Sequence, residues 1–536
     1  MGFDVLNQPY GKSRYSVSAN NGMVCSSNPL ASSTGLEILK KGGNAVDAAI
    51  ATAAVLTIVE PTSNGLGGDA YAIVWMKNKL YGLNASGYSP KSMTIEKLKS
   101  DGYTKMPKHG WIPVTIPGQP KAWAALIKRF GNLELIEVLE PAIRYAQEGY
   151  PISPAVSFLW EKYVNKNSEE FKNNPIFAEW YKVFTKKGKP YKFGDIVKFP
   201  EHAKSLKLIG ESYADAFYNG EIAQKIVEQS KNHGGYIELE DLEEYDVEWV
   251  EPISLNYRGY DVWELPPNGQ GIVTLMSLNI LKNFPLKDKE NVETYHHQFE
   301  AIKLAFSDAL STVTDLDAMK IDFHKYLNNG YGITRSSEIK DYAKAPLPLQ
   351  PPTSGTVYLC TADKEGNMVS YIQSNYMDFG SGVVVEDYGI ALQNRGFDFS
   401  LNVEDANALS PRKKSYHTII PGFLSKDGKA IGPFGVMGGY MQPQGHLQLM
   451  MNYIDFHLNP QMCIDSPRWQ WKEGKHFLVE PDFSQEMVTK LREKGHDIEV
   501  SKNCFSFGRA QMIVKLANGV YVGATESRSD GSICCY

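Results

Sequence analysis

The order of hydrophobic and polar positions near the N-terminus predicts a buried helix, a glycine-rich loop and a buried strand. Residues 45–59 are apolar on nearly every side, which is typical of a helix packed against neighbours all round. Asn44 is a suitable N-cap for this helix, and Pro61 ends it. The glycine-rich stretch 64–69 then leads into 70–75, a run of β-forming residues.

Similar patterns predict further elements along the chain. Thr34 and Glu37 have the spacing of a capping box, so we expect a short helix over 35–41. Longer helices are predicted over 121–130, 133–148, 221–230, 292–310 and 445–456. We expect Pro141 to break or kink the second of these. Strands are predicted near 254–265 and over 389–392, 477–479, 512–514 and 520–524.

A proline-rich segment interrupts these patterns. Residues 345–355 contain four prolines in eleven positions, and such a stretch neither continues a helix nor lies inside a sheet. We therefore expect an exposed, extended segment there. A β-hairpin is predicted directly after it, with strands 356–363 and 367–374 joined by a short loop that contains Gly366.

The predicted hairpin brings two hydroxyl groups together. If Asp363 pairs with Asn367, then Thr356 lies opposite Ser374. A threonine that begins a strand behind a glycine suggests self-cleavage, because its hydroxyl can attack the carbonyl group of Gly355. Hydrolysis of the resulting ester would leave Thr356 as a new N-terminus, whose α-amine takes the hydroxyl proton without a separate histidine. From spacing alone, the alternative is that Thr356 is simply the first residue of a strand.

Composition and charge exclude several classes of protein. Hydrophobic residues make up 43% of the chain and charged residues 22%, which indicates a globular protein. The 55 Lys and Arg against 61 Asp and Glu give a net charge of −6 without a basic stripe, so nucleic acid is not an expected partner. No apolar stretch is long enough to span a membrane and no secretory signal is evident, so we expect a cytoplasmic protein without membrane contact.

Cysteines and histidines show no disulfide or metal pattern. The six cysteines are scattered without a CxxC spacing, so a disulfide scaffold is not expected. His296 and His297 lie in a predicted helix and have no third ligand at metal spacing. We therefore interpret them as ordinary helix histidines, and we expect neither a metal nor an organic cofactor.

Long motifs follow one another over most of the chain in a characteristic order. They comprise residues 42–49, 65–68, 356–367, 379–381, 389–390, 398–400, 405–408, Pro421, 438–439 and 467–468. In these motifs the sequence resembles the gamma-glutamyltransferase family of N-terminal nucleophile hydrolases. The resemblance implies an α+β fold, namely a four-layer αββα sandwich. It also implies self-cleavage into a large subunit, 1–355, and a small subunit, 356–536, which together form one αββα domain.

The same resemblance implies roles for the residues of the reaction centre. Thr356 aligns with the autoprocessing nucleophile, so the cleavage site lies between Gly355 and Thr356. Ser374 falls where the family has a hydroxyl hydrogen-bonded to the nucleophile, in agreement with the hairpin register. Gly438 and Gly439 align with the glycine pair whose backbone N–H groups form the oxyanion hole. Without the resemblance, this pair is interpreted as a tight turn before a helix.

The substrate side of the implied site departs from the family pattern. Asp398 resembles the carboxylate that binds the ammonium group of a glutamyl substrate, although taken alone it would be a solvated loop aspartate. Tyr376 stands where the family has a substrate-binding asparagine. His417 and Thr418 stand where the family has paired serines.

The largest departure concerns charge. Ser86 occupies the position of the family arginine that clamps the substrate α-carboxylate. Arg395, three residues before Asp398, supplies a replacement positive charge in one interpretation and is a surface arginine in the other.

Three hypotheses follow. In the first, the chain is an autoprocessing gamma-glutamyltransferase-like acyltransferase or amidohydrolase that cleaves γ-glutamyl amides such as glutathione through a threonine acyl-enzyme. In the second, the same machinery is an acylase for a different amide, such as a dicarboxylic monoamide or a β-lactam side chain. In the third, the chain is an unprocessed, non-catalytic relative. For an active enzyme we expect a small amide substrate, release of the acyl group to water or an acceptor amine, and a heterodimer of the two subunits, with a further homodimer left open.

Overall fold

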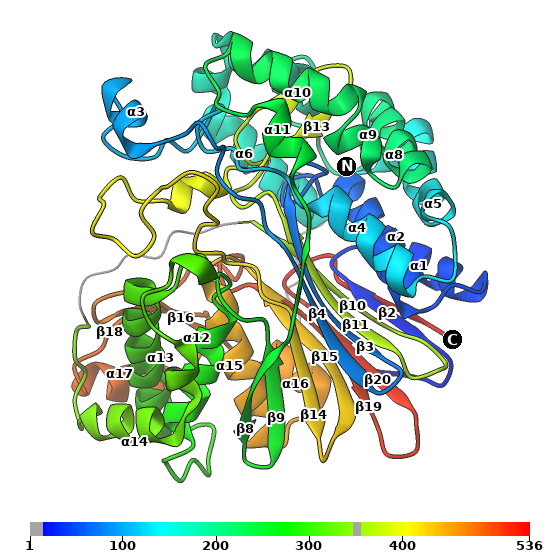
Figure 1. Ribbon diagram of the computed structural model, residues 1–536. Coiled ribbons are helices and arrows are strands. Elements are labelled where there is room, and N and C mark those ends of the chain that lie inside the picture. Colours follow the sequence, from blue (N-terminus) through cyan, green and yellow to red (C-terminus); the bar gives the residue numbers. More distant parts are fainter. Residues whose placement is uncertain (1–13, 347–354) are drawn as a thin grey trace.

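Two seven-stranded sheets lie face to face in the computed structural model, which describes residues 14–346 and 355–536 (Figure 1). The first sheet consists, in spatial order, of β1 (Val17–Ala19), β20 (Tyr521–Thr525), β19 (Arg509–Lys515), β15 (Lys429–Met437), β14 (Gly422–Lys426), β9 (Tyr260–Glu264) and β8 (Ile253–Tyr257). The second consists of β21 (Ser532–Cys535), β2 (Met23–Ser26), β10 (Val357–Ala362), β11 (Met368–Ser374), β3 (Asp69–Met76), β4 (Lys79–Ala85) and β7 (Glu248–Val250).

Alternation along β10 explains why this strand is buried on both faces. Tyr358 and Cys360 point into the layer between the sheets, where they meet Phe423 of the facing sheet. Val357 and Leu359 point the other way, into the core between this sheet and its helices. Because successive side chains of a strand face opposite sides, a strand in the middle of a sandwich is apolar at every position.

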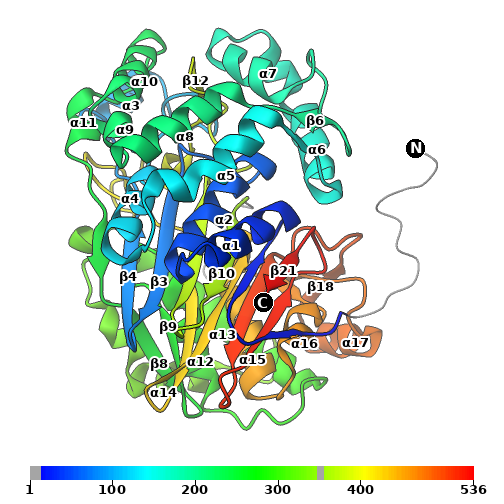
Figure 2. The same cartoon turned by 90° about the vertical axis from the view of Figure 1, so that its right-hand side faces the viewer.

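Helices cover the outer face of the second sheet. The helix α2 (Ala45–Val59) is buried along its whole length and packs on β10 and β11. Figure 2 shows α5 outside α2, with α8 beyond it, so α2 is shielded from solvent by further helices. The other helices on this side are α1 (Pro29–Lys40), α4 (Gln119–Phe130), α5 (Leu135–Glu148) and α8 (Pro200–Ser212).

A second set of helices covers the outer face of the first sheet and completes the αββα sandwich (Figure 1). It consists of α12 (Gly271–Leu281), α13 (Val292–Thr312), α14 (Asn329–Glu338), α15 (Met441–Ile454), α16 (Pro460–Asp465) and α17 (Gln485–Glu493). The remaining elements are β5 (Tyr150–Pro151), β6 (Ile196–Val197), β12 (Val384–Val385), β13 (Ile390–Ala391), β16 (Trp469–Glu473), β17 (His476–Val479), β18 (Asp497–Val500), α3 (Ile95–Ser100), α6 (Pro154–Lys172), α7 (Ala178–Phe184), α9 (Asp215–Tyr218), α10 (Glu221–Asn232), α11 (Leu239–Glu243) and the 3₁₀ helices η1 (Pro175–Phe177), η2 (Leu316–Ala318), η3 (Phe323–Leu327) and η4 (Arg395–Asp398).

The structure confirms the predicted fold class and most predicted elements, but the start of the first helix was predicted wrongly. The first helix begins at Pro29, with Asn28 as its N-cap, rather than at 35. Thr34 lies inside this helix, and its hydroxyl donates to the carbonyl oxygen of Leu30 instead of capping a new helix. Of the break or kink predicted at Pro141, the break does not occur, because α5 continues through this residue.

Other expectations concern segments and groups outside the sheets. The proline-rich segment falls mostly on 347–354, which lies outside the described residues. All six cysteines are free thiols. Among the helices of the described ranges, we find no segment with the length and hydropathy that a membrane crossing requires.

Candidate active site

The hairpin formed by β10 and β11 has the register expected from the sequence. Val357 pairs with Gln373 and Ala362 with Met368, so Thr356 and Ser374 lie opposite each other at the open end of the hairpin. Asp363 closes the other end, because its carboxylate accepts from backbone N–H groups of the turn.

Two hydroxyl groups surround the carbonyl oxygen of Gly355. The Oγ1 of Thr356 lies 2.7 Å from this oxygen, and the Oγ of Ser374 donates to it at 2.8 Å. The two hydroxyl oxygens are 3.1 Å apart. The backbone N–H of Tyr376 donates to Ser374 Oγ at 2.8 Å, which fixes the position of that hydroxyl. The hydroxyl of Thr356 therefore lies beside the peptide bond that precedes it, and a second hydroxyl donates to the same carbonyl group.

Gly438 and Gly439 form a tight turn between β15 and α15. Their φ angles of +131° and +59° lie in the region that favours glycine. Among the described residues, none accepts a hydrogen bond from the backbone N–H of either glycine. Gly438 and Gly355 line one cavity, so the first glycine of the turn and the residue before Thr356 border the same space. This arrangement can bind a developing negative charge.

Gln270 holds this glycine turn, and the sequence analysis missed it. Its side-chain amide donates to the carbonyl oxygens of Gly439, at 2.8 Å, and Thr418, at 2.6 Å. The hydroxyl of Tyr416 donates to the Gln270 Oε1 at 3.3 Å. A glutamine between two glycines in 269–271 was the available signal of this role in the sequence.

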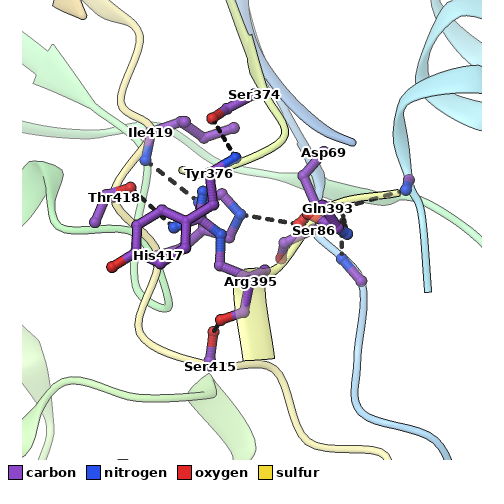
Figure 3. A network of polar contacts seen from close by, with 12 residues as sticks. Asp69, Ser86, Ser374, Tyr376, Gln393, Arg395, Ser415, His417, Thr418 and Ile419 are labelled. Atoms are coloured by element: carbon purple, nitrogen blue, oxygen red, sulfur yellow. Dashed lines mark hydrogen bonds and ion pairs between the residues drawn. The ribbon is translucent and has the colours of Figure 1, made fainter. Parts of the chain in front are cut away.

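Arg395 is completely buried, which excludes the interpretation as a surface arginine. Figure 3 shows its side chain among Tyr376, His417 and Thr418. The guanidinium carbon lies 4.0 Å from the centroid of the Tyr376 ring, and Nη1 donates to Thr418 Oγ1 at 2.9 Å. The Nε and Nη2 atoms have no hydrogen-bond partner among the described residues. Since buried polar groups are normally paired, these two N–H groups remain available to a further hydrogen-bond acceptor.

Asp398 is also buried, contrary to its interpretation as a solvated loop residue. The hydroxyl of Tyr376 donates to Asp398 Oδ1 at 2.5 Å, and Arg395 Nη1 lies 3.8 Å from Oδ2. Burial raises the pKa of Asp398 to about 6, while Arg395 and Tyr376 act in the opposite direction. Oδ1 is therefore engaged by Tyr376, whereas Oδ2 faces Arg395 without a hydrogen-bond partner among the described residues.

Comparison with known proteins identifies the family of this site. The family model for Gamma-glutamyltranspeptidase matches residues 31–536. The chain belongs to the gamma-glutamyltranspeptidase family. It is 38% identical to the glutathione hydrolase-like YwrD proenzyme of Bacillus subtilis (96% of this chain, 99% of that protein), and 31% identical to the oxamate amidohydrolase proenzyme of Klebsiella pneumoniae (97% and 99%). Its structure is similar to that of a cephalosporin acylase from Bacillus halodurans, with a TM-score of 0.97, 51% identity and coverage of 100% and 99%.

Membership of this family defines the kind of enzyme. Its proenzymes include hydrolases, an amidohydrolase and acylases, and the match extends over nearly the whole chain. The chain is therefore an autoprocessing amidohydrolase of the gamma-glutamyltranspeptidase type.

One buried hydrogen bond between a histidine and an aspartate was not expected from the sequence. His417 Nε2 lies 3.0 Å from Asp69 Oδ2, and the backbone N–H of Ile419 donates to His417 Nδ1. The Nε2 atom therefore carries the proton, and burial together with Arg395 lowers the pKa of His417 well below its usual value. The side chain of Gln393 donates to Asp69 Oδ1 at 2.8 Å (Figure 3). An aspartate at the start of an apolar strand was the available signal.

Asp69 thus ties together the segments that carry the substrate-side residues. Its Oδ1 also accepts from the backbone N–H groups of Gly87 and Gly118. Burial raises the pKa of Asp69 to about 7, although these donors and Arg395 favour the ionised form. Ser86, at the position of the family arginine, donates to Asn84 Oδ1 at 2.7 Å and brings no charge.

A cluster beside α13 changes one premise of the sequence interpretation of the two adjacent histidines, namely that no third ligand is near. Glu300 and His496 lie beside His296, so the fold supplies groups that the local spacing lacked. His296 Nδ1 is 2.8 Å from His496 Nε2, and the ammonium of Lys303 is 2.5 Å from Glu300 Oε1. A divalent cation at this place would face the buried ammonium, so the donor set does not fit a metal.

Proposed function

We propose that the chain cleaves itself between Gly355 and Thr356 and that the resulting enzyme hydrolyses amides whose acyl group ends in a carboxylate. The hydroxyl of Thr356 attacks the Gly355 carbonyl carbon, and Ser374 stabilises the oxygen as it gains charge. The peptide nitrogen leaves as the α-amine of Thr356, and water hydrolyses the ester that remains. Residues 1–355 and 356–536 then stay together as two subunits, because β10 lies between β2 and β11 in one sheet.

The mature reaction uses the same hydroxyl with its own α-amine. The amine accepts the hydroxyl proton of Thr356 as the oxygen attacks the substrate amide carbon. The backbone N–H groups of Gly438 and Gly439 hold the oxyanion, and the protonated amine returns the proton to the leaving nitrogen. Water then releases the acyl group from the threonine ester.

The unpartnered N–H groups of Arg395 support a carboxylate at the far end of the acyl group. Nε and Nη2 offer two donors in a planar fork, which suits bidentate binding of a carboxylate. Asp398 Oδ2 has no hydrogen-bond partner among the described residues, but Arg395 Nη1 lies 3.8 Å from it, so the guanidinium competes with a substrate ammonium for this oxygen. A dicarboxylic monoamide therefore fits better than a γ-glutamyl amide. The similarity to an oxamate amidohydrolase and a cephalosporin acylase supports this choice.

Three anilides that differ only in the acyl group test the proposal. Glutaryl-4-nitroanilide carries the carboxylate, γ-glutamyl-4-nitroanilide adds an ammonium, and butyryl-4-nitroanilide has neither. We expect kcat/KM to decrease in this order, measured as release of nitroaniline. Equal values for the glutaryl and butyryl compounds would contradict a carboxylate site. A clear preference for the γ-glutamyl compound would favour the glutathione hydrolase alternative, which several relatives support.

The acyl preference should depend on pH through Asp398. Below pH 6 this carboxyl group is protonated, and above pH 6 its negative charge opposes a substrate carboxylate at Arg395. We expect KM for the glutaryl anilide, divided by KM for the butyryl anilide, to rise between pH 5 and 7.5. In Asp398→Asn, which keeps an acceptor for Tyr376, the ratio should be constant. A flat ratio in the unmodified enzyme would show that Asp398 does not face the bound carboxylate.

Loss of the Gln270 amide should affect the chemical step. In Gln270→Leu, the carbonyl group of Gly439 loses a donor and the N–H groups of the glycine turn lose their fixed direction. We expect kcat to fall about 10-fold, less than the loss of a whole oxyanion donor, with KM within about twofold. Tyr416→Phe, which removes only the bond to Gln270 Oε1, should have a smaller effect. An equal change in KM and kcat would indicate a structural role instead.

A further inference from the structure

Two cysteines face each other from chain segments that self-cleavage would assign to different subunits. Cys25 lies on β2 and Cys360 on β10, and the antiparallel pairing of these strands places the two residues directly opposite each other. The Cα atoms of such a pair are about 4.5 to 5.5 Å apart, which falls within the range of about 4.4 to 6.8 Å that a disulfide bond spans. The backbone therefore already has the spacing that a disulfide bond requires.

The two side chains meet in the layer between the sheets. Opposite residues of an antiparallel pair project to the same face, and both cysteines belong to the group of side chains that fills this layer. Their thiols are in hydrogen-bond contact. On the facing sheet, a Cβ atom at Gly523 of β20 would lie 2.3 Å from Met23 Sδ and 3.3 Å from Cys25 Sγ. The missing side chain at Gly523 thus leaves room for the sulfur atoms.

The position of the thiol pair determines how it reacts. Both cysteines are fully buried, and this burial, together with the neighbouring thiol, raises the pKa of Cys25 well above its usual value. Because the thiolate is the reactive form, the pair reacts more slowly with an oxidant than an exposed thiol does. Only the edge strand β21 separates β2 from the border of the sheet, so local opening at this edge gives a small oxidant access.

We propose that Cys25 and Cys360 form a disulfide bond when a peroxide is present, and that this bond joins the large subunit to the small one after self-cleavage. One thiol takes an oxygen atom from the peroxide, which gives a sulfenic acid and one water. The sulfur of the second thiol then attacks the sulfenic sulfur, and its proton leaves with the hydroxyl group as a second water. The link between subunits rests on the proposed self-cleavage, whereas the bond itself does not.

Oxidation of the purified, self-cleaved protein with hydrogen peroxide tests this bond. The protein is then denatured in N-ethylmaleimide, which blocks free thiols and prevents exchange, and its intact mass is measured with and without a reductant. Without the reductant we expect one species that contains 1–355 and 356–536, and with it two separate chains. Peptide mapping should show the Cys25 peptide joined to the Cys360 peptide. The uncleaved Thr356→Ala chain should give the same joined peptides.

Four alanine variants assign the bond to this pair of thiols. Cys25→Ala and Cys360→Ala should each remain two separate chains after oxidation. Cys463→Ala removes an equally buried thiol of the small subunit, and Cys535→Ala removes a partly buried thiol on β21 that packs against the same layer. Both of these control variants should still become linked.

The outcomes separate this proposal from the proposed function. A link that survives Cys360→Ala, or one that Cys535→Ala abolishes, would overturn the proposal. The absence of joined peptides from both the unmodified protein and Thr356→Ala would overturn it as well, while self-cleavage stands. If the unmodified chain is never cleaved but gives the joined peptides, the bond is established and the proposed self-cleavage fails.

Discussion

The Thr356→Ala chain is expected to remain a single polypeptide of 536 residues, whereas the unmodified chain separates under denaturing conditions into 1–355 and 356–536. The change removes the hydroxyl of residue 356, which lies 2.7 Å from the Gly355 oxygen. Without that hydroxyl neither the ester nor the free α-amine of Thr356 can form. Amidase activity should therefore fall by at least about 10³-fold. Intact-mass analysis and nitroanilide release measure the two effects.

Two further variants distinguish the nucleophile from its neighbour. Thr356→Ser keeps a hydroxyl and should still be cleaved. Cleavage should be slower, because serine lacks the methyl group that restricts the rotamer of the threonine hydroxyl. Ser374→Ala removes the donor to the Gly355 oxygen and should slow self-cleavage without preventing it. An uncleaved but fully active enzyme, or a Thr356→Ala chain that is still cut at the same bond, would refute the mechanism.

Replacement of Arg395 should abolish the preference for a carboxylate-bearing acyl group. In Arg395→Gln, we expect kcat/KM for glutaryl-4-nitroanilide to fall about 100-fold, since two charge-assisted hydrogen bonds are lost. The value for butyryl-4-nitroanilide should change less than about threefold. Arg395→Lys should be intermediate, because an ammonium keeps the charge and loses the planar fork.

Self-cleavage provides the control for folding in these variants. Arg395 is buried beside Tyr376 and Thr418, so its replacement also disturbs packing. A variant that still separates into two subunits has assembled the hairpin that carries Thr356 and Ser374. If such a variant loses activity equally on both anilides, Arg395 supports the structure of the site and does not select the acyl group.

Local patterns predicted the centre of the fold well. The limits of α2 and the register of β10 with β11 depend on neighbouring residues, on capping by Asn44 and on the turn that Asp363 closes. The capping-box pattern at Thr34 failed because the helix had already begun at Pro29, and an internal threonine bonds back to the preceding turn. A local pattern of this kind predicts a helix start only when the pattern does not lie inside a helix that has already begun.

By itself the sequence determined the candidate nucleophile, its opposite hydroxyl and the glycine pair, because the hairpin register and the family motifs each depend on a short stretch of chain. Only the tertiary structure decided that Arg395 is buried with two free N–H groups and that Gln270 holds the glycine turn. It alone brought Asp69 to His417, 348 residues away along the chain. Such contacts arise from how sheets and loops pack together, and burial then determines each group's charge and its free hydrogen bonds. The hydrophobic periodicity of a single segment does not predict these effects.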